Sequence, residues 1–168
     1  TYMTLLKVFT SMNIKHFLKS MAPVQLVGFS TSSSGATLPV TMKRCEKDLG
    51  ISEEISSFVL PLGATINMDG TALYQGVAAV FIAQAVGMDL TLANQFTIVA
   101  TAVLASIGTA AVPGAGIIML IIILEAINVP SEGIALILGV DRILDMIRTA
   151  TNVTGDATVA SVMDSLER

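Results

Sequence analysis

Residues 141–156 read DRILDMIRTATNVTGD and mix apolar residues with charged and polar ones at helical spacing. After Asp141, the residues Asp145, Arg148, Asn152 and Asp156 follow at offsets of 4, 7, 11 and 15. On an α-helix that turns about 100° per residue, these side chains project onto a stripe about 80° wide. The neighbouring apolar side chains lie off that stripe, so this segment is predicted to be a helix with one polar face.

The rest of the chain is strongly apolar. Of its 168 residues 53% are hydrophobic and 13% are charged, and the mean hydropathy is +0.77. A soluble domain carries roughly 25% charged residues. The apolar residues also come in long blocks, which disfavours the alternative of an unusually apolar soluble α/β domain. We therefore expect a piece of a multi-pass membrane protein.

The blocks differ in how they are interrupted. A lead-in at residues 1–20 is followed by blocks at residues 21–42, 51–86, 90–128 and 131–162. Small or polar residues divide the first three blocks near their midpoints, and the halves of 21–42 and 90–128 are shorter than the roughly 20 residues a membrane span needs. This indicates two re-entrant helical hairpins, a transmembrane helix unwound at its centre (51–86) and a polar-striped transmembrane helix (131–162).

The charges beside the blocks suggest an orientation. Lysines and arginines flank the block 21–42, whereas only Asp and Glu flank the block 90–128. By the positive-inside rule, the first hairpin opens to the cytoplasm and the second to the outside. The expected fold is an all-α membrane protein, in which two re-entrant hairpins and two crossing helices form an inverted repeat. Such repeats with broken helices are frequent in secondary transporters.

Several functions find no support in the composition. The net charge is −4 and no basic run occurs, so nucleic acid is not an expected partner. The single Cys45 cannot form an intrachain disulfide, and no Cys/His cluster of metal-binding type is present. The N-terminus lacks the pattern of a signal peptide, and we expect the chain to be cut from a longer protein.

Three segments carry candidate chemistry. Charged groups on the 141–156 stripe need partners or water at membrane depth, either as a ligand site or as an internal salt-bridge ladder. The NMDG run at residues 67–70 predicts an unwound turn whose carbonyls, with Asp69, suit a small hard cation, although a simple kink is the alternative. The small residues at 32–34 and 112–116 allow backbone to approach a ligand closely, or form flexible loops.

Four motifs in the same order resemble the dicarboxylate/amino acid:cation symporters, the family of the excitatory amino acid transporters and their prokaryotic homologues. They are SSSGATLP at 32–39, NMDGT at 67–71, the run from SIGT to PGAG at 106–116, and the 141–156 stripe. The resemblance covers roughly residues 22–162. It implies sodium-coupled symport by alternating access, a homotrimer in the full-length form, and no cofactor apart from sodium as the coupling ion.

The resemblance also implies substrate-binding residues. Arg148 would bind the side-chain carboxylate of an acidic amino acid or dicarboxylate, and Asp145 would bind an amino group. The remaining contacts would come from the side chains of Thr71, Thr149 and Asn152 and from the backbone at Ser34, Val112 and Gly116.

Three sodium sites are implied in the same way. The first would use carbonyls of Gly63, Asn67 and Asn152 with the Asp156 carboxylate. The second would use carbonyls of Thr65, Ser106, Ile107 and Thr109. The third would use the Asp69 carboxylate with the Asn67 side chain.

The chain departs from the family pattern at some positions. Gln75 stands where the animal glutamate carriers have a glutamate linked to proton and potassium coupling, which favours a prokaryotic, sodium-driven carrier in the inner membrane. The family's preceding scaffold helices lie outside this sequence, so a non-transporting fragment is one alternative. An intramembrane aspartyl enzyme, pairing Asp69 with Asp145 or Asp156, is another.

Overall fold

The computed structural model describes residues 1–167, which are almost entirely helical and contain no strand. The elements are α1 (Tyr2–Phe9), α2 (Ile14–Thr31), α3 (Ser34–Asp48), α4 (Glu53–Ile66), α5 (Asp69–Ala85), α6 (Leu92–Ile107), α7 (Ala115–Ala126), the 3₁₀-helix η1 (Ser131–Leu136) and α8 (Leu138–Glu167). The all-α class expected from the sequence is thus confirmed. Within the described residues, no helix is both long and apolar enough to qualify as a membrane span.

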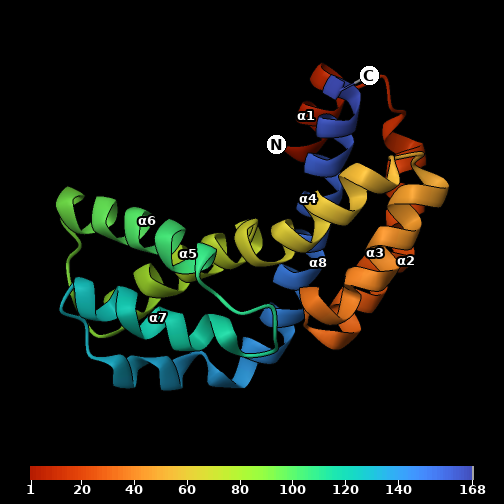
Figure 1. Ribbon diagram of the computed structural model, residues 1–168. Coiled ribbons are helices and arrows are strands. Elements are labelled where there is room, and N and C mark those ends of the chain that lie inside the picture. The colour runs from red at the N-terminus through yellow and green to blue at the C-terminus, as the bar shows by residue number, and fades with distance from the viewer. Residues whose placement is uncertain (168) are drawn as a thin grey trace.

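The helices form two lobes that share α8 (Figure 1). In one lobe α1 to α4 pack around the C-terminal half of α8, and in the other α5, α6, α7 and η1 pack together. Each lobe has its own apolar core, with Phe17, Met21 and Leu60 in the first and Ile82, Leu120 and Ile123 in the second. The polar stripe of α8 lies where the lobes meet.

The helical pair α2–α3 is joined by the two residues Ser32 and Ser33. Ser32 adopts a left-handed conformation (φ 52°), which ends α2, and the Ser33 side chain accepts a hydrogen bond from the Ala36 N–H and caps α3. The two helices pack against each other and extend beyond the predicted hairpin, from residue 14 to 48 instead of 21 to 42. Capping by Asn13 starts this pair earlier than the apolar pattern indicates.

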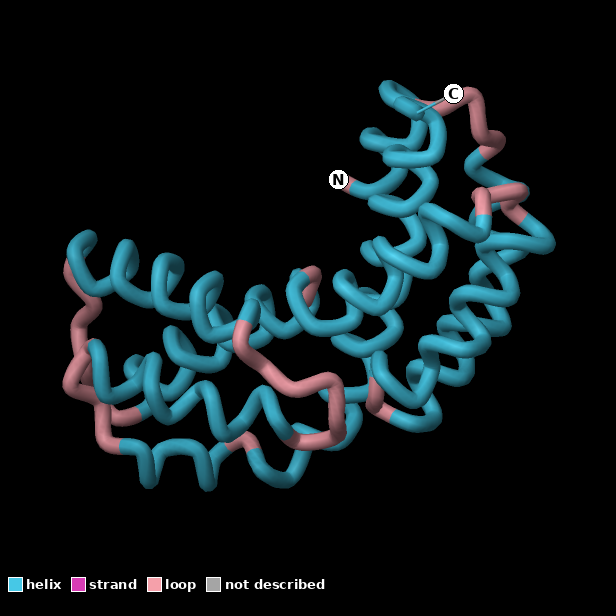
Figure 2. Tube along the Cα trace, in the orientation of Figure 1, coloured by secondary structure: helices cyan, strands magenta, loops and turns pink. Residues whose placement is uncertain are grey.

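The second helical pair, α6–α7, has a longer connection. The helices pack against each other, and residues 108–114 join them as the loop visible in Figure 2. Pro113 and Gly114 end this loop, and Gly114 has a positive φ of 78° that a side chain would disfavour. The structure therefore has two helical pairs where two hairpins were expected, and their relation to a bilayer stays a prediction.

The predicted break in the block 51–86 is present but short. Only Asn67 and Met68 leave helical geometry, and Asp69 and Gly70 already belong to the first turn of α5. The last predicted helix also begins later than expected, because residues 131–136 form the 3₁₀-helix η1 and α8 starts at Leu138.

Candidate functional site

The polar stripe of α8 is buried. Asp141, Asp145, Arg148, Asn152 and Asp156 expose between 3 and 8% of their surface. Ile143 and Ile147, which lie off the stripe, expose 50% or more. Buried charge is tolerated only with partners, so the contacts of each polar group determine what this face can bind.

A small polar cavity lies along this stripe. Its volume is about 10 Å³, which is barely enough for one water molecule. All eight predicted substrate-binding residues line it, together with five others: Ser34, Thr71, Val112, Gly116, Asp145, Arg148, Thr149 and Asn152, and then Ser32, Met68, Thr109, Ala110 and Ala111. The structure thus brings residues from α3, α5, α7, α8 and the α6–α7 loop to one place.

Arg148 is the one cation among the residues that line this cavity. Its Nε donates to Asp145 Oδ1 at 2.9 Å, its Nη1 lies 3.6 Å from Asp141 Oδ1, and its guanidinium stacks 4.3 Å from the centre of the Tyr74 ring. The Tyr74 hydroxyl donates to Asp141 Oδ1 at 2.7 Å. Nη1 and Nη2 are buried and make no hydrogen bond within residues 1–167, so both can donate to a further acceptor.

The guanidinium is held against α7 by a close backbone approach. A Cβ atom added to Gly116 would lie 2.8 Å from both Cζ and Nη1 of Arg148. A side chain at this position would push the guanidinium away, so the glycine is required for the observed packing.

The segments that join the two helices of each pair, residues 32–33 and 108–114, are called the tips below. Asp145 connects α8 to the tip of the second pair. Its Oδ2 accepts a hydrogen bond from the Gly114 N–H at 2.8 Å, while its Oδ1 accepts from Arg148. Both oxygens are therefore held by donors. This arrangement disfavours an aspartyl dyad at Asp145, which would need a carboxylate sharing a proton with a second one.

The two tips touch each other above the cavity. The Ser33 hydroxyl donates to the Ala111 carbonyl oxygen at 2.6 Å, and the Gly35 N–H donates to the same oxygen at 3.3 Å. Because Ala111 belongs to the α6–α7 loop and lines the cavity, this contact joins the two helical pairs at the cavity.

Asn152 links α8 to the start of α5, next to the α4–α5 break. Its Oδ1 accepts from the Gly70 N–H at 2.7 Å, and its Nδ2 donates to Thr71 Oγ1 at 3.1 Å and contacts Met68 Sδ at 3.2 Å. The side chain is thereby fixed between the predicted substrate and sodium residues.

Two of the predicted sodium-binding residues, Gly63 and Asn67, lie beside a third, Asp156. Asn67 Nδ2 donates to Asp156 Oδ1 at 2.9 Å, and a Cβ added to Gly63 would lie 2.8 Å from the same oxygen. Asp69 lies at the surface of this chain, where its Oδ2 accepts a hydrogen bond from the Tyr2 hydroxyl at 2.8 Å. Within residues 1–167, no group of three or more His, Cys, Asp or Glu side chains could hold a metal ion.

The residues predicted for the second sodium site lie at the ends of two helices. Thr65 is near the end of α4, Ser106 and Ile107 end α6, and α4 and α6 are in contact. The Ser106 carbonyl accepts a hydrogen bond from the Thr109 N–H at 3.1 Å. Their convergence on one ion stays a prediction.

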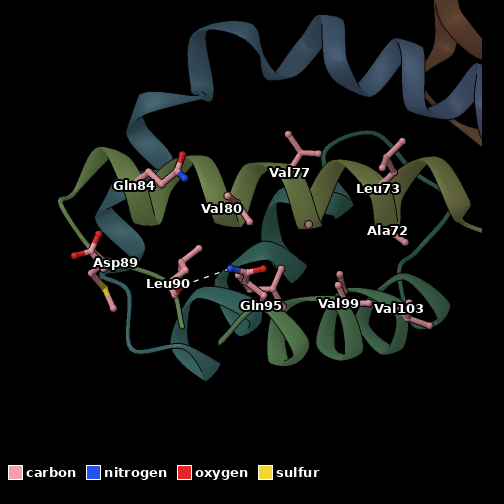
Figure 3. Close-up of a pocket in the computed structure, with 14 residues that line it drawn as sticks. Ala72, Leu73, Val77, Val80, Gln84, Asp89, Leu90, Gln95, Val99 and Val103 are labelled. Carbon is pink, nitrogen blue, oxygen red and sulfur yellow. Dashed lines mark hydrogen bonds between the residues drawn. The ribbon is translucent and has the colours of Figure 1, made fainter. Parts of the chain in front are cut away.

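A much larger groove, of about 830 Å³, lies elsewhere, between α5 and α6 (Figure 3). Leu73, Val77 and Val80 line it from α5, opposite Val99 and Val103 of α6. None of the predicted site residues lines this groove. Its lining is mostly apolar and contains no Lys or Arg to bind an acidic ligand, so the small polar cavity is the better candidate despite its size.

Sequence reasoning missed several residues of the site. Tyr74 and Met68 were not predicted as site residues, because an aromatic residue or a methionine within an apolar block usually belongs to the hydrophobic core. Tyr2 was part of a lead-in without an assigned role. A tyrosine spaced one helical turn from Thr71 on the same helix was the available signal for Tyr74.

These features define a helical core in which two tips close over a buried arginine, and comparison with known proteins identifies its family. Residues 1–166 match the family model described as the sodium:dicarboxylate symporter family. The chain belongs to this family.

Curated relatives agree with this assignment. The chain is 46% identical over 156 residues to an excitatory amino acid transporter of Caenorhabditis elegans, covering 93% of the chain and 31% of the relative. It is 49% identical over 152 residues to excitatory amino acid transporter 3 of Mus musculus, and 46% identical over 152 residues to excitatory amino acid transporter 1 of Rattus norvegicus. These two matches cover 90% of the chain and 29% and 28% of the relatives.

The chain thus spans less than a third of the length of these relatives. All three are animal proteins, and they give no support to the prokaryotic origin expected from Gln75. Their names are those of transporters, which does not favour the aspartyl-enzyme alternative.

Proposed function

We propose that this chain is the substrate- and ion-binding core of a sodium-coupled symporter for acidic amino acids or dicarboxylates, embedded in the cell membrane. The observation that carries the proposal is the small polar cavity, which is lined by the buried Arg148 together with the seven other predicted substrate residues. Membership of the sodium:dicarboxylate symporter family supports the same function.

The charge of the cavity favours an acidic substrate. Arg148 has two buried nitrogens, Nη1 and Nη2, that make no hydrogen bond to the described residues. A planar guanidinium fork matches the two oxygens of a carboxylate, and the pair is strong where water is excluded. We infer that these two nitrogens bind the side-chain carboxylate of the substrate.

Asp145 is the proposed partner of the substrate amino group. Its Oδ2 accepts one hydrogen bond, from the Gly114 N–H, and a carboxylate oxygen has room for a second donor, so an ammonium group would bind there while the tip stays attached. Substrate binding would in this way act directly on the tip of the second helical pair.

The cavity has to open before a substrate can enter, because about 10 Å³ cannot contain an amino acid. The α6–α7 tip is the proposed outer gate. Its loop of residues 108–114 is longer than the two-residue turn of α2–α3, and its contacts with Ser33, Gly35 and Asp145 are individual hydrogen bonds that can be broken. A ligand would shift this gate only through a different affinity for the open and closed forms.

Sodium is the proposed coupling ion. Asn67, Asp156 and Gly63 lie together beside the helix break, where a carboxylate and nearby backbone carbonyls supply the oxygen ligands that suit a hard cation. Asn152 lies between this region and the cavity, since it contacts Gly70 and Thr71. An ion bound here would therefore order the same side chain that the substrate contacts.

The outer surface fits a membrane setting. Large apolar side chains on α5, α6, α7 and the outer face of α8 are exposed, among them Leu73, Phe96, Ile118 and Ile143. We propose that lipid or the remaining part of the protein covers them, that the two helical pairs are re-entrant hairpins opening to opposite sides, and that the full-length protein is a homotrimer.

Sodium-dependent binding of labelled aspartate to the full-length protein tests the function, with succinate as competitor. We expect saturable aspartate binding in sodium and none in choline. Competition by succinate would indicate a dicarboxylate carrier, and its absence an amino acid carrier. Sodium-independent binding, or no binding of either acid, would refute the proposed function.

A further inference from the structure

The first helix reaches the candidate ion-binding region through one hydroxyl group. Tyr2 begins α1, which packs along α8, and its hydroxyl donates to Asp69 Oδ2 at 2.8 Å. Asp69 lies 67 positions further along the chain, in the first turn of α5. No other hydrogen bond or ion pair within residues 1–167 restrains this carboxylate.

A glycine of α8 makes room for this contact. A Cβ added to Gly155 would lie 2.6 Å from the Tyr2 hydroxyl oxygen and 2.7 Å from Asn67 Nδ2. The two polar groups therefore meet over the same point of the α8 backbone. Any side chain at this position would displace one of them.

Two hydrogen bonds consequently converge above Gly155. One joins Tyr2 to Asp69, and the other joins Asn67 Nδ2 to Asp156 Oδ1. Both carboxylates have a neutral donor, and neither takes part in an ion pair within the described residues. The Asn67 nitrogen is committed to Asp156, which leaves the amide oxygen as an acceptor for a cation.

We propose that Tyr2 is a positioning residue for sodium binding at Asp69. This inference rests on the proposed function. The Asp69 carboxylate is at the surface of the chain and would rotate freely without the phenol. The hydrogen bond from Tyr2 keeps this carboxylate near Asn67. The oxygen ligands are then already ordered before a cation binds, which lowers the entropic cost of binding.

A purely structural role for Tyr2 predicts something different. If the ring only packed α1 onto α8, removing the hydroxyl would change the stability of the ion-free protein and leave the sodium affinity unchanged. A positioning role changes the sodium affinity and acts through Asp69 alone.

The test uses the full-length protein and sodium without substrate. The rise of the melting temperature with sodium concentration reports the affinity, because an ion that binds only the folded form stabilises it by mass action. We expect Tyr2→Phe to raise the half-effective sodium concentration about two- to tenfold, as for the loss of one hydrogen bond. Tyr2→Leu, which also lacks the hydroxyl, is the substitute if the phenylalanine variant does not fold.

Tyr74→Phe is the matched control. It removes the other tyrosine hydroxyl that donates to an aspartate, here Asp141 at 2.7 Å beside Arg148. We expect it to weaken aspartate binding at saturating sodium and to leave the response to sodium alone as in the parent protein. In an Asp69→Asn background, Tyr2→Phe should have no further effect, because coupled residues are not additive.

The outcomes separate the two proposals. A parent protein without any sodium response overturns the proposed function and this inference with it. A responding parent whose Tyr2→Phe variant has an unchanged sodium curve overturns the inference alone. An additive effect of Tyr2→Phe in the Asp69→Asn background does so as well.

Discussion

Replacing Arg148 with alanine removes the positive charge of the small polar cavity and tests the substrate site most directly. The Arg148 side chain is 4% exposed, so a carboxylate bound to it would be largely shielded from water. Leaving one partner of a buried ion pair alone costs about 3–5 kcal/mol, which corresponds to roughly a hundred- to several-thousand-fold in Kd. We expect Arg148→Ala to abolish measurable aspartate binding.

The assay is binding of labelled aspartate to the full-length protein at saturating sodium. Arg148→Lys is the matched variant, because it keeps the charge that faces Asp141 and Asp145 but lacks the planar fork, and we expect an intermediate loss. A neutral amino acid such as serine should bind to Arg148→Ala no more weakly than to the parent. An aspartate Kd within about threefold of the parent value would refute the assignment, since this is far below the cost of an unpaired buried charge.

Three further changes address the ion, the gate and the packing of the arginine. Asp156→Asn should shift the sodium dependence of aspartate binding to higher concentrations, because the amide keeps the shape but loses the charge, and a superimposable sodium titration would remove Asp156 from the ion site. In a Cys45-free background, Ala115→Cys should react with an impermeant thiol reagent added from outside when only sodium is present. Added aspartate should protect this cysteine. Equal labelling in both conditions, or labelling only from the cytoplasmic side, would contradict the outer gate. Gly116→Ala should weaken aspartate binding about tenfold or more, since its Cβ would lie 2.8 Å from Arg148 Cζ, and an unchanged Kd would show that the guanidinium is free to move.

Much of the site follows from local sequence patterns. The spacing of Asp141, Asp145, Arg148, Asn152 and Asp156 indicates one helical face, and that face is buried in the structure. The two tips and the break at residue 67 can also be predicted from the sequence. Their glycines, serines and other polar residues interrupt apolar blocks that would otherwise continue as helix.

Contacts between distant segments could not be predicted in this way. The hydrogen bonds from Tyr74 to Asp141 and from Tyr2 to Asp69 each join residues 67 positions apart, and nothing in the pattern near a tyrosine indicates its partner. Helix ends were also misplaced, since side-chain caps such as Asn13 and the 3₁₀ geometry of η1 depend on a few residues and not on periodicity.

The two separate apolar cores have a consequence for how the protein unfolds. One core belongs to α1–α4 and the end of α8, and the other to α5–α7 and η1, so neither needs the other to bury its apolar side chains. What joins them is the polar layer around Arg148 and Asn152, the contact of Ser33 and Gly35 with Ala111, and the chain itself in α8 and at the α4–α5 break. Heating should then melt the two lobes in distinct steps when this layer is weak. A substrate and ions that bridge the layer would merge the steps into one cooperative transition, so the sharpness of melting, and not only its midpoint, reports occupancy of the site.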